Sequence, residues 1–435
     1  MRKIIALLLC FILTVSLISC NTGNDEPKVP SDDRSDDTSN EEKYKPVLDI
    51  YKDVVMNFDE QGNSKDSPYA EGTKEYEWRG AIIRALLTFY LSTEIPGYPH
   101  ISKNVPGYAF CDLNKNGNDE MVLLLDDYTV LAIFSFADGE PVLLDHYWNR
   151  KKCAIEQDGT IQVRGSSGAY NSSQYTTSHS IYEIAKDDTE LVRLEEYGTD
   201  GRDPETLHPY YYKISNGNKT PITVLEYAAA FSLYHYTSLT EHTKENASFA
   251  FVPLELDYKR VFEKILNYEM KINSEDKYLW ELYFSFEANS IGNLERVEIC
   301  YLDMDGDGIE ELLLRSNSRD HIILRYYNGS VCIYEYSPKE MARVYEDGSY
   351  SWSSPTYLED YSHYYGFSTI SFDEDGAKVN PIYTIYEGEN ESYFIIDGKF
   401  ASKTELDALM ESRKDIKEVT WTTYTLDFSK IPAKG

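Results

Sequence analysis

Two short acid-rich stretches, each followed at once by an apolar run, constrain the fold of this chain most strongly. One runs from Asp112 to Glu120 and the other from Asp303 to Glu311. Both carry side-chain oxygens at relative positions 1, 3, 5 and 9 and a glycine at position 6. Glycine there permits the positive φ that folds the chain back over its own side chains. Each stretch is therefore expected to form a tight loop that leads into a strand.

Oxygens at alternate positions of a tight loop can point at one centre. Calcium takes about six to eight oxygen ligands at roughly 2.3–2.6 Å, so the spacing predicts a calcium site in each loop. The candidate ligands of the second loop are Asp303, Asp305, Asp307, Glu311 and the backbone carbonyl of Ile309. Those of the first loop are Asp112, Asn114, Asn116, Glu120 and the backbone carbonyl of Asn118. The alternative in either case is a turn closed by Asp and Asn side chains without metal. Because affinity depends on ligand charge, we expect the second loop, with more carboxylates, to bind calcium better.

The spacing resembles the first part of an EF-hand loop, but only in part. An EF-hand has a bidentate acid at position 12, where this chain has Leu123 and Leu314. With the acid at position 9, the stretches are similar to the D-x-D-x-D-G-x-x-E/D loops of integrin-type and VCBS-type repeats and of two-module bacterial surface lipoproteins. This resemblance implies that each loop joins strands rather than helices.

The N-terminus has the features of an export signal. Arg2 and Lys3 precede an apolar run from Ile4 to Leu17, which is shorter than the roughly 20 residues needed to span a bilayer. The run ends in Leu17-Ile18-Ser19-Cys20, which resembles the bacterial lipobox. The resemblance implies a signal peptide over residues 1–19, lipid on Cys20, and an extracytoplasmic protein anchored to the bacterial cell membrane or outer membrane. An ordinary signal peptide with an incidental cysteine is the alternative.

Residues 20–43 comprise the lipidated cysteine and a polar, acidic segment without apolar periodicity. Such a segment cannot bury enough apolar surface to order itself, so we expect a disordered linker. The whole chain has a formal net charge of -32. That charge excludes a nucleic-acid partner, because phosphates require a basic surface.

The remaining chain is too long for one usual domain and contains an internal repeat. Asp303 lies 191 residues after Asp112, and Asp347-Gly348 lies 189 residues after Asp158-Gly159. A period this long indicates two whole domains rather than the short repeats of a propeller. We therefore expect a tandem duplication, with module 1 at residues 44–245 and module 2 at residues 246–435.

Each module is expected to be α+β, with N-terminal helices, a mainly antiparallel sheet entered through the Asp-rich loop, and a short C-terminal helix. Helical periodicity covers Tyr44–Phe58, Glu77–Leu91, Leu256–Ile272 and Asp276–Ala288. Strand patterns cover Met121–Leu125, Val130–Phe136, Ile161–Arg164, Ser180–Ile184, Glu311–Leu314, Ile322–Tyr327, Val331–Tyr336 and Ser392–Ile396. Asp138-Gly139 and Asn328-Gly329 predict hairpin turns, and Ser402 with Glu405 predicts a helix start.

The other residues with reactive or binding chemistry leave the function open. Four cysteines, Cys111, Cys153, Cys300 and Cys332, could pair within each module or remain buried thiols. The sequence has no HExxH, GxSxG or Walker pattern. The 38 tyrosines fit packed strand faces or an exposed platform for a surface glycan or protein partner.

A calcium-stabilised binding module without catalytic activity is the favoured function. A glycan- or wall-directed hydrolase that uses unidentified carboxylates is the alternative.

Overall fold

The computed structural model describes residues 37–57, 67–91, 104–169, 172–233, 239–246, 249–270, 272, 279, 296–315, 321–336, 340–354, 363–373, 376–387 and 392–426. The expected signal peptide over residues 1–19, Cys20 and nearly all of the helix expected over Asp276–Ala288 lie outside these residues. The described chain combines helices with several antiparallel sheets and is richer in strand than in helix. None of its helices is long and apolar enough to cross a membrane.

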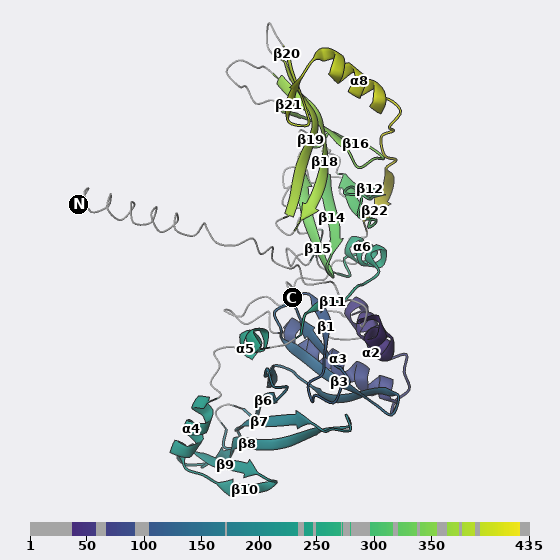
Figure 1. Ribbon diagram of the computed structural model, residues 1–435. Coiled ribbons are helices and arrows are strands. Elements are labelled where there is room, and N and C mark those ends of the chain that lie inside the picture. Colours follow the sequence, from purple (N-terminus) through teal and green to yellow (C-terminus); the bar gives the residue numbers. More distant parts are fainter. Residues whose placement is uncertain are drawn as a thin grey trace, which may run out of the picture. The chain divides into compact units, whose positions relative to one another are not determined.

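The first sheet has the strand order β11-β1-β2-β3-β4. Figure 1 labels its strands β11, β1 and β3. Its members are β1 (Pro106–Cys111), β2 (Glu120–Leu125), β3 (Val130–Ala137), β4 (Glu140–His146) and β11 (Val252–Pro253). Asp138 and Gly139 form the predicted hairpin turn between β3 and β4, and their φ of 54° and 84° are those of a type I′ turn.

Two helices, α2 (Asp37–Asn57) and α3 (Lys74–Leu91), pack on this sheet. The rings of Trp78 on α3 and Phe134 on β3 meet edge to face at 6.0 Å. Helix α2 begins at Asp37 rather than at Tyr44, so the predicted polar linker includes its first turns. The apolar periodicity starts only at Tyr44 because the residues before it are polar, which is why the pattern missed the true start.

The second sheet is a six-stranded meander in the order β10-β9-β8-β7-β6-β5. Its members are β5 (Lys151–Ile155), β6 (Ile161–Ser167), β7 (Thr176–Ile184), β8 (Leu191–Arg202), β9 (Pro209–Ser215) and β10 (Asn218–Pro221). Helix α4 (Val224–Leu233) follows, and Tyr227 on it packs against Tyr211 of β9 with ring centroids 4.7 Å apart. Helix α5 (Leu239–Asn246) then leads to β11.

The C-terminal half again contains a five-stranded and a six-stranded sheet. The smaller has the order β22-β12-β13-β14-β15, formed by β12 (Arg296–Leu302), β13 (Glu311–Arg315), β14 (His321–Tyr327), β15 (Ser330–Tyr336) and β22 (Thr422–Thr425). The larger comprises β16 (Arg343–Val344), β17 (Tyr350–Ser354), β18 (His363–Asp373), β19 (Gly376–Glu387), β20 (Ser392–Ile396) and β21 (Lys399–Ala401), in chain order.

The helices that the structure describes in this half, α6 and α8, are shorter than α2 and α3 of the first. Helix α6 (Tyr258–Leu266) ends earlier than the expected Leu256–Ile272, since Asn267 caps it and Tyr268 has φ of 59°. Helix α8 (Lys403–Arg413) starts with the predicted capping box, in which Ser402 and Glu405 bond each other's backbone N–H.

The two halves share their strand order. The order β11-β1-β2-β3-β4 corresponds to β22-β12-β13-β14-β15, and β5 to β10 correspond to β16 to β21. In each half the edge strand beside the first strand comes from the C-terminal end of that half. The pair β11 and β1, with Gly107 opposite Pro253, lies across the expected module boundary at residues 245 and 246. By strand pairing, the first half therefore extends through β11.

Candidate functional site

The two acidic loops occupy corresponding places in the two five-stranded sheets. The first joins β1 to β2, and the second joins β12 to β13, which are antiparallel neighbours in both cases. Gly117 and Gly308, at position 6 of each loop, have φ of 92° and 89°. The positive φ predicted for both glycines is therefore observed, and each loop turns back over its own side chains.

Backbone N–H groups hold the acidic side chains of the second loop. Asp303 accepts hydrogen bonds from Gly306 at 2.7 Å and from Gly308 at 3.0 Å. The N–H of Met304 donates to Oε2 of Glu311 at 2.8 Å. These bonds orient the carboxylates. Because Glu311 uses only Oε2 in them, its Oε1 can still bind a further ligand.

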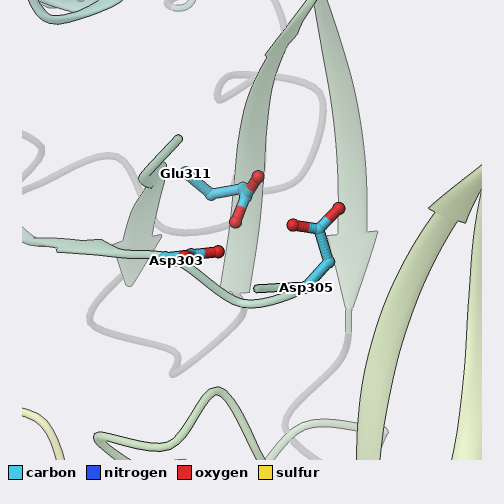
Figure 2. Close-up of side chains that lie close together, drawn as sticks. All are labelled: Asp303, Asp305 and Glu311. Atoms are coloured by element: carbon cyan, nitrogen blue, oxygen red, sulfur yellow. The ribbon is translucent and has the colours of Figure 1, made fainter. Parts of the chain in front are cut away.

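Three of the expected ligands of this loop come together. One carboxylate oxygen from each of Asp303, Asp305 and Glu311 lies within 4.8 Å of the other two, and Figure 2 shows the three carboxylates close together. Oxygens that share an ion at about 2.4 Å can be at most about 4.8 Å apart, so this group could hold a metal ion. Ile309, expected to contribute its carbonyl, donates its backbone N–H to Asp307 at 2.8 Å.

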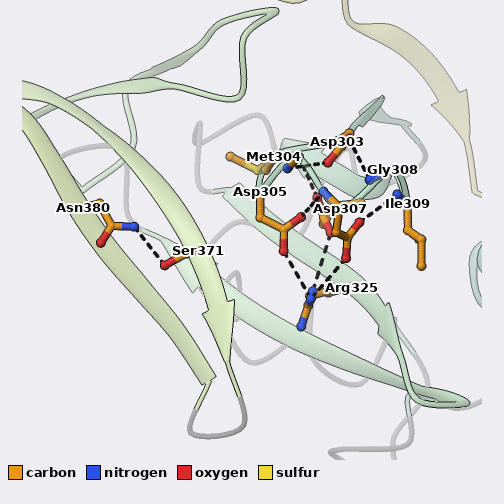
Figure 3. A network of polar contacts seen from close by, with 11 residues as sticks. Asp303, Met304, Asp305, Asp307, Gly308, Ile309, Arg325, Ser371 and Asn380 are labelled. Atoms are coloured by element: carbon orange, nitrogen blue, oxygen red, sulfur yellow. Dashed lines mark hydrogen bonds and ion pairs between the residues drawn. The ribbon is translucent and has the colours of Figure 1, made fainter. Parts of the chain in front are cut away.

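A buried arginine that the sequence pattern did not reveal lies against this loop. Nη2 of Arg325, on β14, is 3.2 Å from Oδ2 of Asp305 and 3.3 Å from Oδ2 of Asp307 (Figure 3). Its Nε is 3.8 Å from Oε1 of Glu311. Only 5% of Arg325 is exposed. The guanidinium of Arg325 therefore places a positive charge beside the acids of the second loop.

The first loop shares part of the backbone pattern of the second. Asp112 accepts hydrogen bonds from Asn116 at 3.0 Å and from Gly117 at 2.9 Å. The N–H of Leu113 donates to Oε2 of Glu120 at 2.7 Å. In both loops the last acid thus accepts the N–H of position 2 and the first acid that of position 6, but the second donor to the first acid is position 5 here and position 4 in the second loop.

The centre of the first loop differs, because its three asparagines converge on a carboxylate from another turn. The Nδ2 atoms of Asn114, Asn116 and Asn118 donate to Asp188 at 2.6, 2.7 and 3.2 Å. Asp188 is buried in the turn between β7 and β8 and has φ of 62°. The hydroxyl of Ser135 on β3 donates to its backbone carbonyl. Nothing in the loop spacing could have identified Asp188, which lies far away in the chain.

The glutamates at position 9 are the most buried acids of the two loops. Glu120 and Glu311 are each 1% exposed, and in each one oxygen lacks a hydrogen-bond partner. Burial raises the pKa of both carboxyls to about 8. The charges of Asp188 and Asp112 add to this effect on Glu120. Those of Asp305 and Asp307 add to it on Glu311, where Arg325 opposes it. A buried carboxylate of this kind requires a proton or a cation.

The four cysteines are free thiols in this structure. Cys111 and Cys153 are buried, and Cys300 and Cys332 are half-buried. Burial raises the pKa of the Cys111 thiol well above its usual range, so the thiol is held in its neutral form. The pairings considered from the sequence, Cys111–Cys153 and Cys300–Cys332, are not formed.

No protein-family model matches the chain, and no curated protein matches it in sequence.

Proposed function

We propose that this protein is a lipoprotein anchored on the extracytoplasmic side of a bacterial membrane, where it presents a calcium-stabilised binding module. The anchor is the lipid expected on Cys20. Arg2 and Lys3, the apolar run and Leu17–Cys20 follow one another in the order that is typical of a lipoprotein signal peptide. Two or more acyl chains there would hold the protein at the membrane stably. The high negative charge agrees with a body that faces a calcium-bearing exterior rather than nucleic acid.

The observation that carries the calcium part is the acidic group of Asp303, Asp305 and Glu311 in the second loop. Its donors are all carboxylate oxygens, which suit a hard cation such as calcium. The first loop stands at the corresponding place between the first two strands of its half. We interpret this correspondence as a tandem duplication in which both copies inherited the loop.

The binding part is supported by exposed apolar side chains in the last strands of the six-stranded sheet and in the helix that follows it, in both halves. In the first half, Tyr210 on β9 and Leu225 on α4 are 53% and 78% exposed. In the second, Phe400 on β21 and Met410 on α8 are 81% and 45% exposed. Apolar side chains that gather into an exposed patch are typical of surfaces that meet a partner. A surface glycan or another protein at the cell surface is the partner we propose.

Lipid anchoring is the part of the function that one experiment tests most simply. Cells that produce the full chain are labelled with a radioactive fatty acid and separated into membrane and soluble fractions. We expect Cys20→Ala to lose the label and leave the membrane fraction. Cys10→Ala, which changes a cysteine inside the apolar run, should retain both. A Cys20→Ala protein that is still labelled and membrane-bound contradicts the proposal.

A further inference from the structure

The guanidinium of Arg325 lies beside the acids of the second loop but binds none of them closely. Its Nη2 is 3.2 Å from Oδ2 of Asp305 and 3.3 Å from Oδ2 of Asp307 (Figure 3). Its Nε is 3.8 Å from Oε1 of Glu311. Hydrogen bonds between a guanidinium and a carboxylate usually measure about 2.7 to 2.9 Å, and a contact of 3.8 Å is too long to be one. The guanidinium therefore neutralises the loop without a tight bond to it.

Another arginine of the same sheet shows how closely a guanidinium can bind a carboxylate. Nε and Nη2 of Arg315, on β13, both lie 2.8 Å from Oε2 of Glu298 on β12. That pair is more exposed than the pair of Arg325 with Asp305. Because a buried pair loses more hydration, it needs close contacts more. The loose fit at Arg325 thus indicates that the shape of the acidic loop is not adapted to a guanidinium.

Two buried atoms that face each other are left without a hydrogen bond. Glu311 is 1% exposed and Arg325 is 5% exposed. Oε1 of Glu311 and Nε of Arg325 both lack a hydrogen-bond partner in the described part of the chain. A buried charged group is stable only with a close partner of opposite charge, so this carboxylate oxygen favours a cation that can approach it more closely.

A calcium ion matches the spacing of the carboxylates better than the guanidinium does. Carboxylate oxygens of Asp303, Asp305 and Glu311 lie within 4.8 Å of one another, so one ion at about 2.4 Å could bind all three (Figure 2). If that ion bound Oδ2 of Asp305, it would lie within about 5.6 Å of Nη2 of Arg325. Like charges this close in a poorly solvated place repel each other strongly. Calcium in the loop therefore opposes the present position of Arg325.

We propose that Arg325 is a built-in competitor of calcium, whose guanidinium neutralises the empty second loop and is displaced from Asp305 and Asp307 when calcium binds. This inference rests on the proposed calcium-stabilised function and names what regulates that site. The displaced group keeps favourable neighbours, since the rings of Tyr327 and Phe372 have centroids 4.5 and 4.6 Å from its Cζ. The competition makes the affinity lower than the acids alone would give, which suits the roughly 10⁻⁴–10⁻³ M range of extracellular calcium modules.

Isothermal titration of the full chain with calcium chloride tests the inference. We expect Arg325→Gln to bind calcium at least about tenfold more tightly than wild type, because the competing charge is removed. Arg325→Lys keeps a positive charge and should stay closer in affinity to wild type than to Arg325→Gln. Arg315→Gln is the matched control, since Arg315 pairs with Glu298 outside the loop, and it should leave the affinity unchanged.

Asp305→Asn shows whether the tighter binding occurs in the second loop. It removes one of the three acids and should abolish the gain when it is combined with Arg325→Gln. Far-UV circular dichroism in EGTA reports whether Arg325→Gln is folded without calcium. If it is not, the comparison is made in Asp307→Asn, which removes an acid outside the group of three. Arg325→Gln added to Asp307→Asn should again tighten binding at least about tenfold.

A second measurement follows the guanidinium in the wild-type chain. In a protein with ¹⁵N-labelled arginine, the Nε–H resonance of Arg325 is identified by its absence from Arg325→Lys. Calcium should shift this resonance in wild type and not in Asp305→Asn. A purely structural Arg325 would keep its surroundings and its resonance. The Nε–H resonance of Arg315 should stay in place in both proteins.

The outcomes separate this inference from the proposed function. If wild type binds calcium in the second loop and Arg325→Gln binds it no more tightly, the inference is wrong while calcium binding stands. An Arg325 resonance that does not shift on this binding also overturns it. If Arg325→Gln binds calcium and wild type does not, the competition is supported and the calcium part of the proposed function fails. If neither binds calcium, both fail.

Discussion

The guanidinium of Arg325, on β14, lies 3.2 Å from the carboxylate of Asp305 in the loop before β13, and both side chains are buried. Two rings lie close to the guanidinium, since Tyr327 and Phe372 have centroids 4.5 and 4.6 Å from its Cζ. These contacts hold the positively charged guanidinium beside the acids of the second loop. The first loop has Asp188 at its centre instead.

Removal of this internal cation should make the stability of the protein depend on calcium. Arg325→Gln leaves four acids around one turn without a positive partner, and loss of one member of a buried pair costs about 3 kcal/mol. We expect that loss in urea unfolding with EGTA, and partial recovery in millimolar calcium. Arg315→Gln is the control, because Arg315 pairs with the more exposed Glu298 and should cost about 1 kcal/mol or less. Equal losses in the two variants would contradict the role assigned to Arg325.

Each acidic loop packs against a glycine from another turn, and we expect this glycine to fix the conformation of the loop. A Cβ on Gly159 would lie 1.8 Å from the carbonyl oxygen of Leu113, and one on Gly348 would lie 2.7 Å from that of Met304. Both glycines thus pack against position 2 of an acidic loop.

We predict that Gly159→Ala destabilises the protein by about 2 kcal/mol or more, because strain at positive φ and a backbone clash add together. Gly139→Ala has the same positive φ but open space around it, and it should cost only about 1 kcal/mol. Thermal unfolding of both variants measures the difference. A Gly159→Ala protein no less stable than Gly139→Ala would show that the contact with Leu113 does not constrain the loop.

His179 should make the fold sensitive to acid. It is buried and lies 3.0 Å from Oε1 of Gln162, and burial, aided by the charge of Arg164, lowers its pKa from 6.5 to about 4. The folded protein therefore keeps the ring neutral where the unfolded chain takes up a proton. Its contribution to stability is complete above about pH 6.5 and is lost as the pH falls toward 4.

Urea unfolding at pH 7.5 and pH 5 checks this dependence. The loss on acidification should be smaller in His179→Gln than in wild type by about 1 to 2 kcal/mol. His208→Gln, which changes an exposed histidine, should lose as much as wild type. An unchanged loss in His179→Gln would mean that this ring does not titrate with unfolding.

The start of α8 offers a test of local structure. The Ser402 hydroxyl accepts the backbone N–H of Glu405, so Ser402→Ala should cost about 1 kcal/mol. Ser412, near the end of the same helix, bonds only the carbonyl of Leu409, and Ser412→Ala should be nearly neutral. Chemical denaturation of both variants measures the difference, and a neutral Ser402→Ala would argue against the capping box.

Local features were predictable from the sequence because neighbouring residues determine them. β20 spans Ser392–Ile396 as its alternating pattern predicts, and Asn328-Gly329 makes the expected hairpin turn with φ of 49° and 75°. The repeated Asp-Gly turns at Gly159 and Gly348 were also visible, although not their contact with the loops.

The partners that close the two loops were not predictable, because they come from other strands and turns. Arg325 reaches its loop only through the pairing of β13 with β14, and Asp188 only through the fold of the second sheet against β3. Neither residue belongs to the spacing that identifies the loops. A count of acids within each loop therefore misses the charges that Arg325 and Asp188 bring to the two loops.

Anomalous diffraction from crystals of the full chain grown with calcium tests the central claim most directly. The account predicts an ion in the second loop, held by carboxylate oxygens of Asp303, Asp305 and Glu311. A second loop without an ion in these crystals would contradict it.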